Sequence, residues 1–144
     1  MKALFFIAVI LIVFASCKKL GGGGSSAPQS LLTAHKWYYH VFTQDGQNIE
    51  LNYCDTNNYL LFSDGSSGGI GNDNAACYGK TGTISTFSYT YSADSNIIHL
   101  RDFSGGNYTW QVLTLTNTTL RVIFTVGAPP PAYAPNFDYT YSAR

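Results

Sequence analysis

Charged residues are scarce in this sequence. Lys, Arg, Asp and Glu make up only 11% of the 144 residues, and the 8 basic residues are balanced by 8 acidic ones. No excess of positive charge is left to neutralise phosphates or to attract nucleic acid. We therefore expect no nucleic-acid partner. The polarity comes instead from Thr, Ser, Asn, Gly and 11 Tyr, a composition typical of β-rich proteins outside the cytoplasm.

Long hydrophobic runs are also missing, with a single exception near the N-terminus. After Met1 and Lys2, the 14 residues from Ala3 to Ser16 are apolar except for the final serine. A helix needs about 20 residues to cross a bilayer, so this run fits the core of a signal peptide better than a membrane anchor. We expect residues 1–16 to be removed on export. The alternative is an uncleaved anchor, or an ordinary signal peptide followed by an incidental cysteine.

The residues that lead to Cys17 resemble the lipobox of bacterial lipoproteins. In that motif, small residues precede a cysteine that is acylated, for example with palmitate, and then becomes the mature N-terminus. The matching segment is Val13–Cys17 (VFASC), in which Phe14 departs from the usual Leu. We expect Cys17 to carry the lipid and residues 17–30 to form a linker, because the run GGGGSS is typical of flexible spacers. Acyl chains on Cys17 would hold the domain at a membrane without insertion.

Lys18 and Lys19 follow the expected lipid-bearing cysteine. Surface-exposed lipoproteins of some Gram-negative groups resemble one another in carrying an acidic run at this place. The two lysines therefore favour a lipid-anchored protein of the cell outer membrane that faces the periplasm.

Cysteine is rare, with three residues in all, and Cys17 leaves the pair Cys54 and Cys77. An even pair in an exported protein predicts a disulfide bond, since that compartment is oxidising. The bond would close a loop of 24 residues that is rich in Gly, Asn and Ser. The competing hypothesis is a catalytic thiol with His35, His40 or His99 as its base, although neither cysteine lies in a local signature of the nucleophilic families.

Helix signals are nearly absent. Only the segment 27–34 could form a helical turn, which would cover one end of the fold before the first strand. From Leu31 onward, short β-like runs alternate with turn signals at the spacing of a sandwich or barrel. The expected strands are 37–42, 48–51, 59–62, 82–91, 97–101, 108–115 and 120–126, with a strand fragment at 68–71.

Two of these runs alternate regularly between large apolar and polar residues. A period of two places one face of a strand against the core and the other in water. The predicted buried faces consist of Phe87, Tyr89 and Tyr91 in the first run and Tyr108, Trp110 and Val112 in the second.

The C-terminal segment 128–144 opens with Ala128 and three prolines, which cannot join a central strand because proline lacks the amide donor. Further on, residues 137–143 read FDYTYSA, and residues 87–93 read FSYTYSA. The likeness is either chance in a chain rich in Tyr, Thr and Ser or a sign of two equivalent strands. A strand at 137–143 would close or extend the sheet with an aromatic face.

The stretch from Leu31 to about Val126 resembles the lipocalin-like domains found in lipoproteins of Gram-negative bacteria. The similarity consists of an early Trp37, a cysteine before the strand that runs into Phe62–Gly65, a second cysteine, and three meandering strands. The resemblance implies an all-β fold over residues 31–127. It would be a small antiparallel up-and-down barrel, or a strongly curved sheet, of about eight strands. No ligand is implied.

Two functions are compatible with such a barrel. It can bind a small apolar or glycan-like molecule on aromatic side chains that have a polar handle. Alternatively, it can be a filled barrel that serves as a structural or protein-interaction module of the envelope. The candidate ligand-binding residues are Trp37, Tyr39, Tyr89, Tyr91, Tyr108 and Trp110.

No motif in the sequence carries recognisable catalytic chemistry. His35 and His40 would face opposite sides of a strand, and His99 has no nearby carboxylate except Asp102. A zinc site needs three or four convergent ligands. We expect a non-enzymatic protein with no metal and no cofactor.

Overall fold

The computed structural model describes residues 27–126 and 136–144. These residues form nine strands in one antiparallel sheet and three short helices, which confirms the predicted all-β fold. The elements are α1 (Ala27–Thr33), β1 (Lys36–Gln44), β2 (Gln47–Ile49), α2 (Tyr53–Thr56), β3 (Asn58–Ser63), β4 (Ser67–Asn72), α3 (Ala75–Tyr78), β5 (Gly82–Ser92), β6 (Ile97–Asp102), β7 (Asn107–Leu115), β8 (Thr119–Val126) and β9 (Phe137–Ala143).

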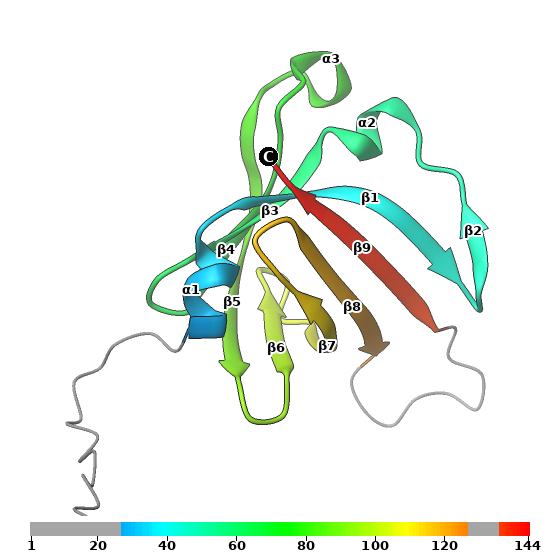
Figure 1. Ribbon diagram of the computed structural model, residues 1–144. Helices are drawn as coiled ribbons and strands as arrows, with labels where there is room; N and C mark the ends of the chain where they lie inside the picture. The colour runs from blue at the N-terminus through cyan, green and yellow to red at the C-terminus, as the bar shows by residue number, and fades with distance from the viewer. Residues whose placement is uncertain (1–26, 127–135) are drawn as a thin grey trace, which may run out of the picture.

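Eight of the strands close into a barrel (Figure 1). Strand β1 pairs with β3 on one side and with β9 on the other, and the strands from β3 to β9 pair in sequence order. Strand β2 only extends the end of β1 through the two-residue turn Asp45-Gly46, where both residues have positive φ as a type I′ hairpin requires. Closure through β1 and β9 joins the two ends of the strand series from β3 to β9.

Strand β9 completes the ring, and its sequence is the near copy of β5. Counted in either direction around the eight strands, β5 and β9 are four steps apart, so they form opposite walls. In both strands the Phe-x-Tyr-x-Tyr residues share the inner face. For β9 this follows because Tyr141 pairs with Leu120 of β8, and both residues are buried. The tail segment is therefore a strand equivalent to β5, and it closes the barrel.

Glycine-rich β4 is a full strand and not a fragment. A Cβ on Gly71 would lie 2.3 Å from the ring of Tyr59, and a Cβ on Gly68 would lie 2.4 Å from the ring of Phe87. The aromatic rings of the neighbouring strands thus cover the backbone of β4 directly. Its glycines allow this close approach, because any side chain would displace the rings.

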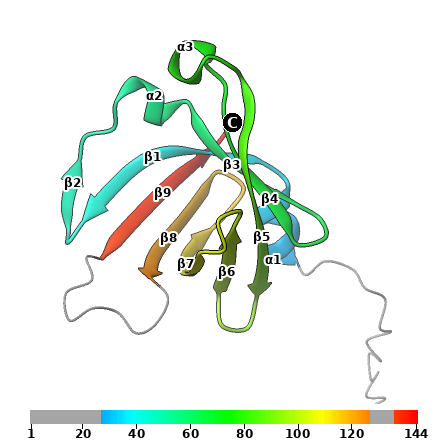
Figure 2. The same ribbon diagram turned by 180° about the vertical axis from the view of Figure 1, so that it is seen from behind.

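Helix α1 covers one end of the barrel, as Figure 2 shows from behind. Leu32 of α1 and Trp37 of β1 are both fully buried, and Trp37 Nε1 donates a hydrogen bond to the Leu32 carbonyl oxygen at 2.8 Å. The core continues from there through the alternating faces of the strands. Phe87 and Tyr89 are buried, whereas Ser88 and Thr90 are exposed, as the pattern in this run predicts.

Candidate functional site

The interior of the barrel is only partly filled. A cavity of about 300 Å³ lies inside it. Its buried lining residues are Leu60, Phe87, Leu100, Trp110 and Tyr141, and its more exposed lining residues are Tyr39, Ile70, Ser85, Thr86, Asp102, Tyr108, Phe124 and Tyr139. Most of this wall is aromatic or aliphatic, so the cavity suits an apolar occupant.

The cavity lies at the end of the barrel away from α1. Asp102 ends β6, Tyr108 lies at the start of β7, and Tyr139 lies near the start of β9. The α1 end is formed instead by Trp37 at the start of β1, which pairs with Ala143 at the end of β9. The barrel therefore has a closed end under α1 and a cavity toward the other end.

Three of the six predicted ligand-binding residues line this cavity, namely Tyr39, Tyr108 and Trp110. The other three lie elsewhere in the barrel. The Nε1–H of Trp37 donates the hydrogen bond to the Leu32 carbonyl described above. The Tyr89 hydroxyl donates a hydrogen bond to the Ser63 carbonyl at 2.9 Å, and the Tyr91 hydroxyl donates one to Asn96 Oδ1 at 3.4 Å. The structure thus divides the predicted set between the two ends.

Sequence reasoning missed much of the cavity wall. Tyr139 and Tyr141 belong to the second copy of the FxYTYSA motif, which was a usable signal because it duplicates a strand with a predicted buried face. Leu60, Leu100 and Phe124 gave no comparable signal, since an apolar residue in a strand is ordinarily a core residue.

A family model of the lipocalin-like domain matches residues 33–122, which is more than half of the chain. The chain belongs to the lipocalin-like domain family. No curated protein and no solved structure gives a significant match. The match ends within β8, so the structure adds β9 to the strands that the family model covers.

Among the described residues that line the lipocalin-like cavity, Asp102 is the only charged one. Its carboxylate accepts hydrogen bonds from the backbone N–H and hydroxyl of Ser104, from the Gly106 N–H, and from the Tyr108 hydroxyl at 2.8 Å. These bonds, with Ser104 first, lower the pKa of Asp102, and the carboxylate in turn raises the pKa of Tyr108. The carboxylate thus fixes the β6–β7 turn and holds Tyr108 against the cavity.

Two tyrosines meet on the β1–β9 side of the cavity. The rings of Tyr39 and Tyr141 have centroids 4.8 Å apart, and their planes are inclined by 56°. Burial raises the pKa of Tyr39 to about 12 and raises the pKa of Tyr141 well above its usual value. Both phenols are therefore neutral at physiological pH and act only as hydrogen-bonding groups.

Trp110 belongs to the same wall. Its side chain is 8% exposed and stacks on Tyr141, with centroids 6.4 Å apart and planes inclined by 19°. Its Nε1–H is the one buried side-chain nitrogen or oxygen that has no hydrogen-bond partner within residues 27–126 and 136–144. Such groups are rare in native structures.

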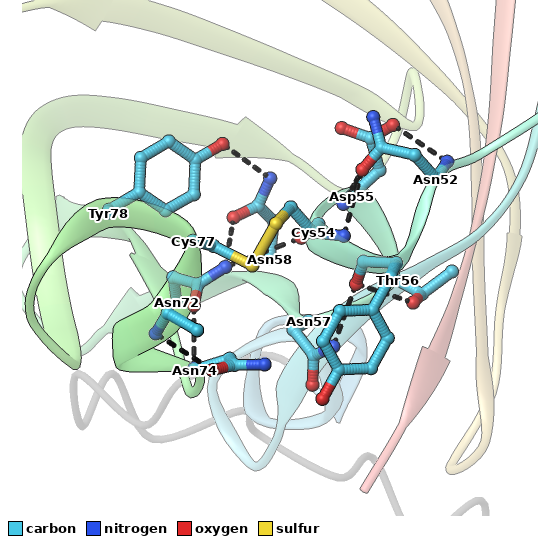
Figure 3. The surroundings of a disulfide bond; sticks show 12 residues. Asn52, Cys54, Asp55, Thr56, Asn57, Asn58, Asn72, Asn74, Cys77 and Tyr78 are labelled. Atoms are coloured by element: carbon cyan, nitrogen blue, oxygen red, sulfur yellow. Dashed lines mark hydrogen bonds between the residues drawn. A yellow bond between two sulfur atoms is a disulfide. The ribbon is translucent and has the colours of Figure 1, made fainter.

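A second hollow of about 290 Å³ adjoins the cavity, because Tyr39 and Tyr139 line both. Its lining includes Asp55 of α2 and Asn58 at the start of β3, both close in sequence to the disulfide-bonded Cys54. The Cys54–Cys77 disulfide is present as predicted and joins α2 to α3 (Figure 3). Since both sulfurs are bonded, neither cysteine offers a thiol for catalysis.

Asparagines organise the backbone around this disulfide (Figure 3). Asn52 caps α2 by accepting hydrogen bonds from the N–H groups of Cys54 and Asp55. Asn72 is fully buried and donates to the Cys54 carbonyl at 3.3 Å and to Asn58 Oδ1 at 2.7 Å. Sequence reasoning missed α2 and α3, because each helix is a single turn held by an asparagine cap and the disulfide.

Three further expectations concern metals and the membrane. Among the described residues, no group of three or more His, Cys, Asp or Glu side chains could hold a metal ion. In the same part of the chain, no helix is long and apolar enough to cross a membrane. The proposed signal peptide and the lipid attachment site Cys17 lie outside the described residues.

Proposed function

We propose that the protein is a lipid-anchored lipoprotein of the cell envelope whose barrel binds a small, largely apolar or glycan-like molecule. The observation that carries the binding part is the cavity of about 300 Å³ inside a closed lipocalin-like barrel. This volume is at the lower end of the range for small-molecule sites. At about 30 Å³ per water molecule, it holds roughly ten waters, or a ligand of similar bulk.

The lining supports a binding role in a second way. Tyr39, Tyr108 and Tyr139 place aromatic rings beside the cavity, and a tyrosine ring offers a large apolar surface at little cost in conformational entropy. A structural module of the envelope would instead require a barrel filled by its own side chains. The unfilled interior favours the binding function over that alternative.

The position of α1 supports an anchor at the N-terminal side. Ala27 begins α1, which covers the closed end of the barrel, so a tether from Cys17 would join the domain at that end. The cavity, at the other end, would then be turned away from the membrane. A ligand could enter without passing the attachment point.

Native mass spectrometry of the unlipidated chain, defined as residues 17–144 with Cys17→Ser, tests the binding function. We expect a fraction of the protein to carry a small molecule of constant mass. Ser85→Trp would fill the cavity and remove the bound mass, whereas Ser88→Trp places the same side chain on the exposed face of β5 and would leave it bound. Bare protein from several expression conditions would contradict the proposal.

The anchor has its own test. Cells that express the full chain are labelled with radioactive palmitate and then fractionated. We expect label on the protein in the membrane fraction, and loss of both label and membrane association in Cys17→Ser. Unlabelled wild-type protein, or a variant that stays in the membrane fraction, would exclude a lipid anchor at Cys17.

A further inference from the structure

The wall of the barrel is interrupted beside β1. Residues 36–38 of β1 pair with residues 59–61 of β3, and residues 42–44 pair with β2. Between these two sets, residues 39–41 have no strand partner on that side among the described residues, although their other side adjoins β9. Because the wall of a barrel is made of hydrogen-bonded neighbouring strands, this interval is a gap in it.

Segment 50–57, which includes α2, covers this gap. Helix α2 contacts both β1 and β3, and in Figure 1 it lies between β3 and the β1–β2 hairpin. Leu51 and Asp55 of the segment line the second hollow, which therefore lies at the gap. Ile49 and Glu50 line the same hollow and are exposed, so the hollow reaches the protein surface.

Two tyrosines stand between the second hollow and the cavity. Tyr39 and Tyr139 line both spaces, with ring centroids 5.9 Å apart and planes inclined by 75°. Both side chains are only half-buried. The surface and the cavity are thus separated at this place by side chains rather than by paired backbone.

Segment 50–57 is held from the side of β4 and α3. The disulfide joins it to α3, and Asn72 donates a hydrogen bond to the Cys54 carbonyl oxygen at 3.3 Å. The Asp73 N–H donates to the Asn57 carbonyl oxygen at 3.1 Å. In the described part of the chain, no hydrogen bond or ion pair joins the segment to β1, β2 or β9. The segment can therefore move away from β1 without breaking a strand pairing, and the disulfide restrains this movement.

The β6–β7 turn gives the contrast within the same wall. Asp102 of this turn also lines the cavity, but its carboxylate accepts hydrogen bonds from Ser104, Gly106 and Tyr108. Movement of the turn would break these bonds, whereas movement of segment 50–57 away from β1 breaks none. The gap beside β1 is therefore the part of the wall that opens at the lower cost.

Resting on the binding function proposed above, we infer that the second hollow is the entrance through which a ligand reaches the cavity, and that segment 50–57 is its movable outer wall. The Cys54–Cys77 disulfide ties this wall to α3 and so limits its opening. The entrance sets the rates at which a ligand enters and leaves. It does not set the affinity, because the bound ligand rests in the cavity and contacts the segment only in passing.

Stopped-flow fluorescence with 1-aminonaphthalene, a neutral and mostly apolar probe, measures these rates on the unlipidated chain. Cys54→Ser combined with Cys77→Ser frees the wall from α3. We expect the association and dissociation rate constants of this double variant both to rise about fivefold or more over the wild type, with a Kd that stays within about twofold.

A second variant narrows the entrance and should act in the opposite direction. Leu51 lines the second hollow but not the cavity, so Leu51→Trp should lower both rate constants about fivefold and leave the Kd within about twofold. Leu113→Trp makes the same substitution at a site that is 45% exposed on β7 and should change neither rate. A general loss of stability would not slow exchange, so it cannot imitate the effect of Leu51→Trp.

Each remaining outcome contradicts a separate part of the account. Unchanged rates in Leu51→Trp would overturn the entrance and leave the binding function standing. A lower affinity in Leu51→Trp with an unchanged association rate would place part of the ligand in the second hollow and would also overturn the entrance. Unchanged rates in the double cysteine variant would overturn the restraint by the disulfide. A wild-type protein that does not bind the probe would overturn this inference and the proposed binding function together.

Discussion

Tyr39 of β1 and Tyr141 of β9 are paired residues whose ring centroids lie 4.8 Å apart, at the junction where the last strand meets the first. This contact joins barrel closure to the site, because both tyrosines also line the cavity. The side chain of Tyr141 is 1% exposed, although it belongs to a strand that the family match does not reach. Strand β9 is thus both a structural element of the barrel and a wall of the cavity.

Removal of the Tyr141 ring should destabilise the barrel strongly. Tyr141→Ala leaves a void among Trp110, Leu120 and Tyr39, and we expect a loss of about 3–5 kcal/mol in the free energy of unfolding, measured by urea denaturation. Tyr141→Phe keeps the ring and should lose less than about 1.5 kcal/mol. Tyr53→Ala, at a site 70% exposed, is the control and should change stability by less than about 0.5 kcal/mol. Equal effects of Tyr141→Ala and Tyr53→Ala would show that β9 does not close the barrel.

Stability should fall at alkaline pH. The phenol of Tyr39 has a pKa of about 12 in the folded protein against 10.0 for the ordinary group, so the folded state keeps a proton that the unfolded state releases. Below about pH 10 a buried phenol is protonated in both the folded and the unfolded state, so its titration does not make stability depend on pH. Between about pH 10 and 12 each phenol with a pKa raised in this way lowers the free energy of unfolding by about 1.4 kcal/mol per pH unit. Urea midpoints at about pH 8 and pH 11 measure the loss.

Tyr39→Phe is the matched variant for this pH dependence. It removes one titrating phenol and should reduce the slope between about pH 10 and 12 by roughly one proton. Tyr141 retains its own raised pKa, so some slope should remain. A midpoint that is the same at both pH values in the wild type would contradict burial of these phenols.

Loss of the disulfide should cost about 3 kcal/mol. The bond between Cys54 and Cys77 spans a sequence separation of 23, and the entropy of closing such a loop in the unfolded chain sets this estimate. Cys54→Ser combined with Cys77→Ser should lower the urea midpoint and increase hydrogen exchange first in α2 and α3, which the bond joins. The wild-type protein under reducing conditions should match the double variant. A double variant as stable as the oxidised wild type would exclude a stabilising role.

Gly68 and Gly69 of β4 form a matched pair. A Cβ on Gly68 would lie 2.6 Å from the Leu61 carbonyl oxygen, which is backbone, whereas the nearest atom to a Cβ on Gly69 is the methyl group of Thr83 at 2.7 Å. A side chain can move more readily than backbone, so Gly68→Ala should lose about 1–3 kcal/mol and Gly69→Ala less. Thermal unfolding of the two variants compares them. A larger loss for Gly69→Ala would contradict the close approach of β3 and β4.

Local pattern was sufficient to predict most strands, because burial in a small barrel leaves a period of two in runs such as 82–91 and 108–115, which lie within β5 and β7. It was not sufficient for the site. Tyr89 and Tyr108 have the same inward pattern, yet Tyr89 bonds to Ser63 outside the cavity wall and Tyr108 lines the cavity. Which end of the barrel an inward residue occupies depends on strand register and on α1, and neither can be read from a single strand.

A crystal structure of the chain isolated from the cells that make it would show whether the cavity binds a ligand. We expect electron density for a small molecule inside the barrel, in contact with Trp110 and Tyr141. A barrel in which Tyr39, Tyr139 and their neighbours fill the same space with their own side chains would contradict it.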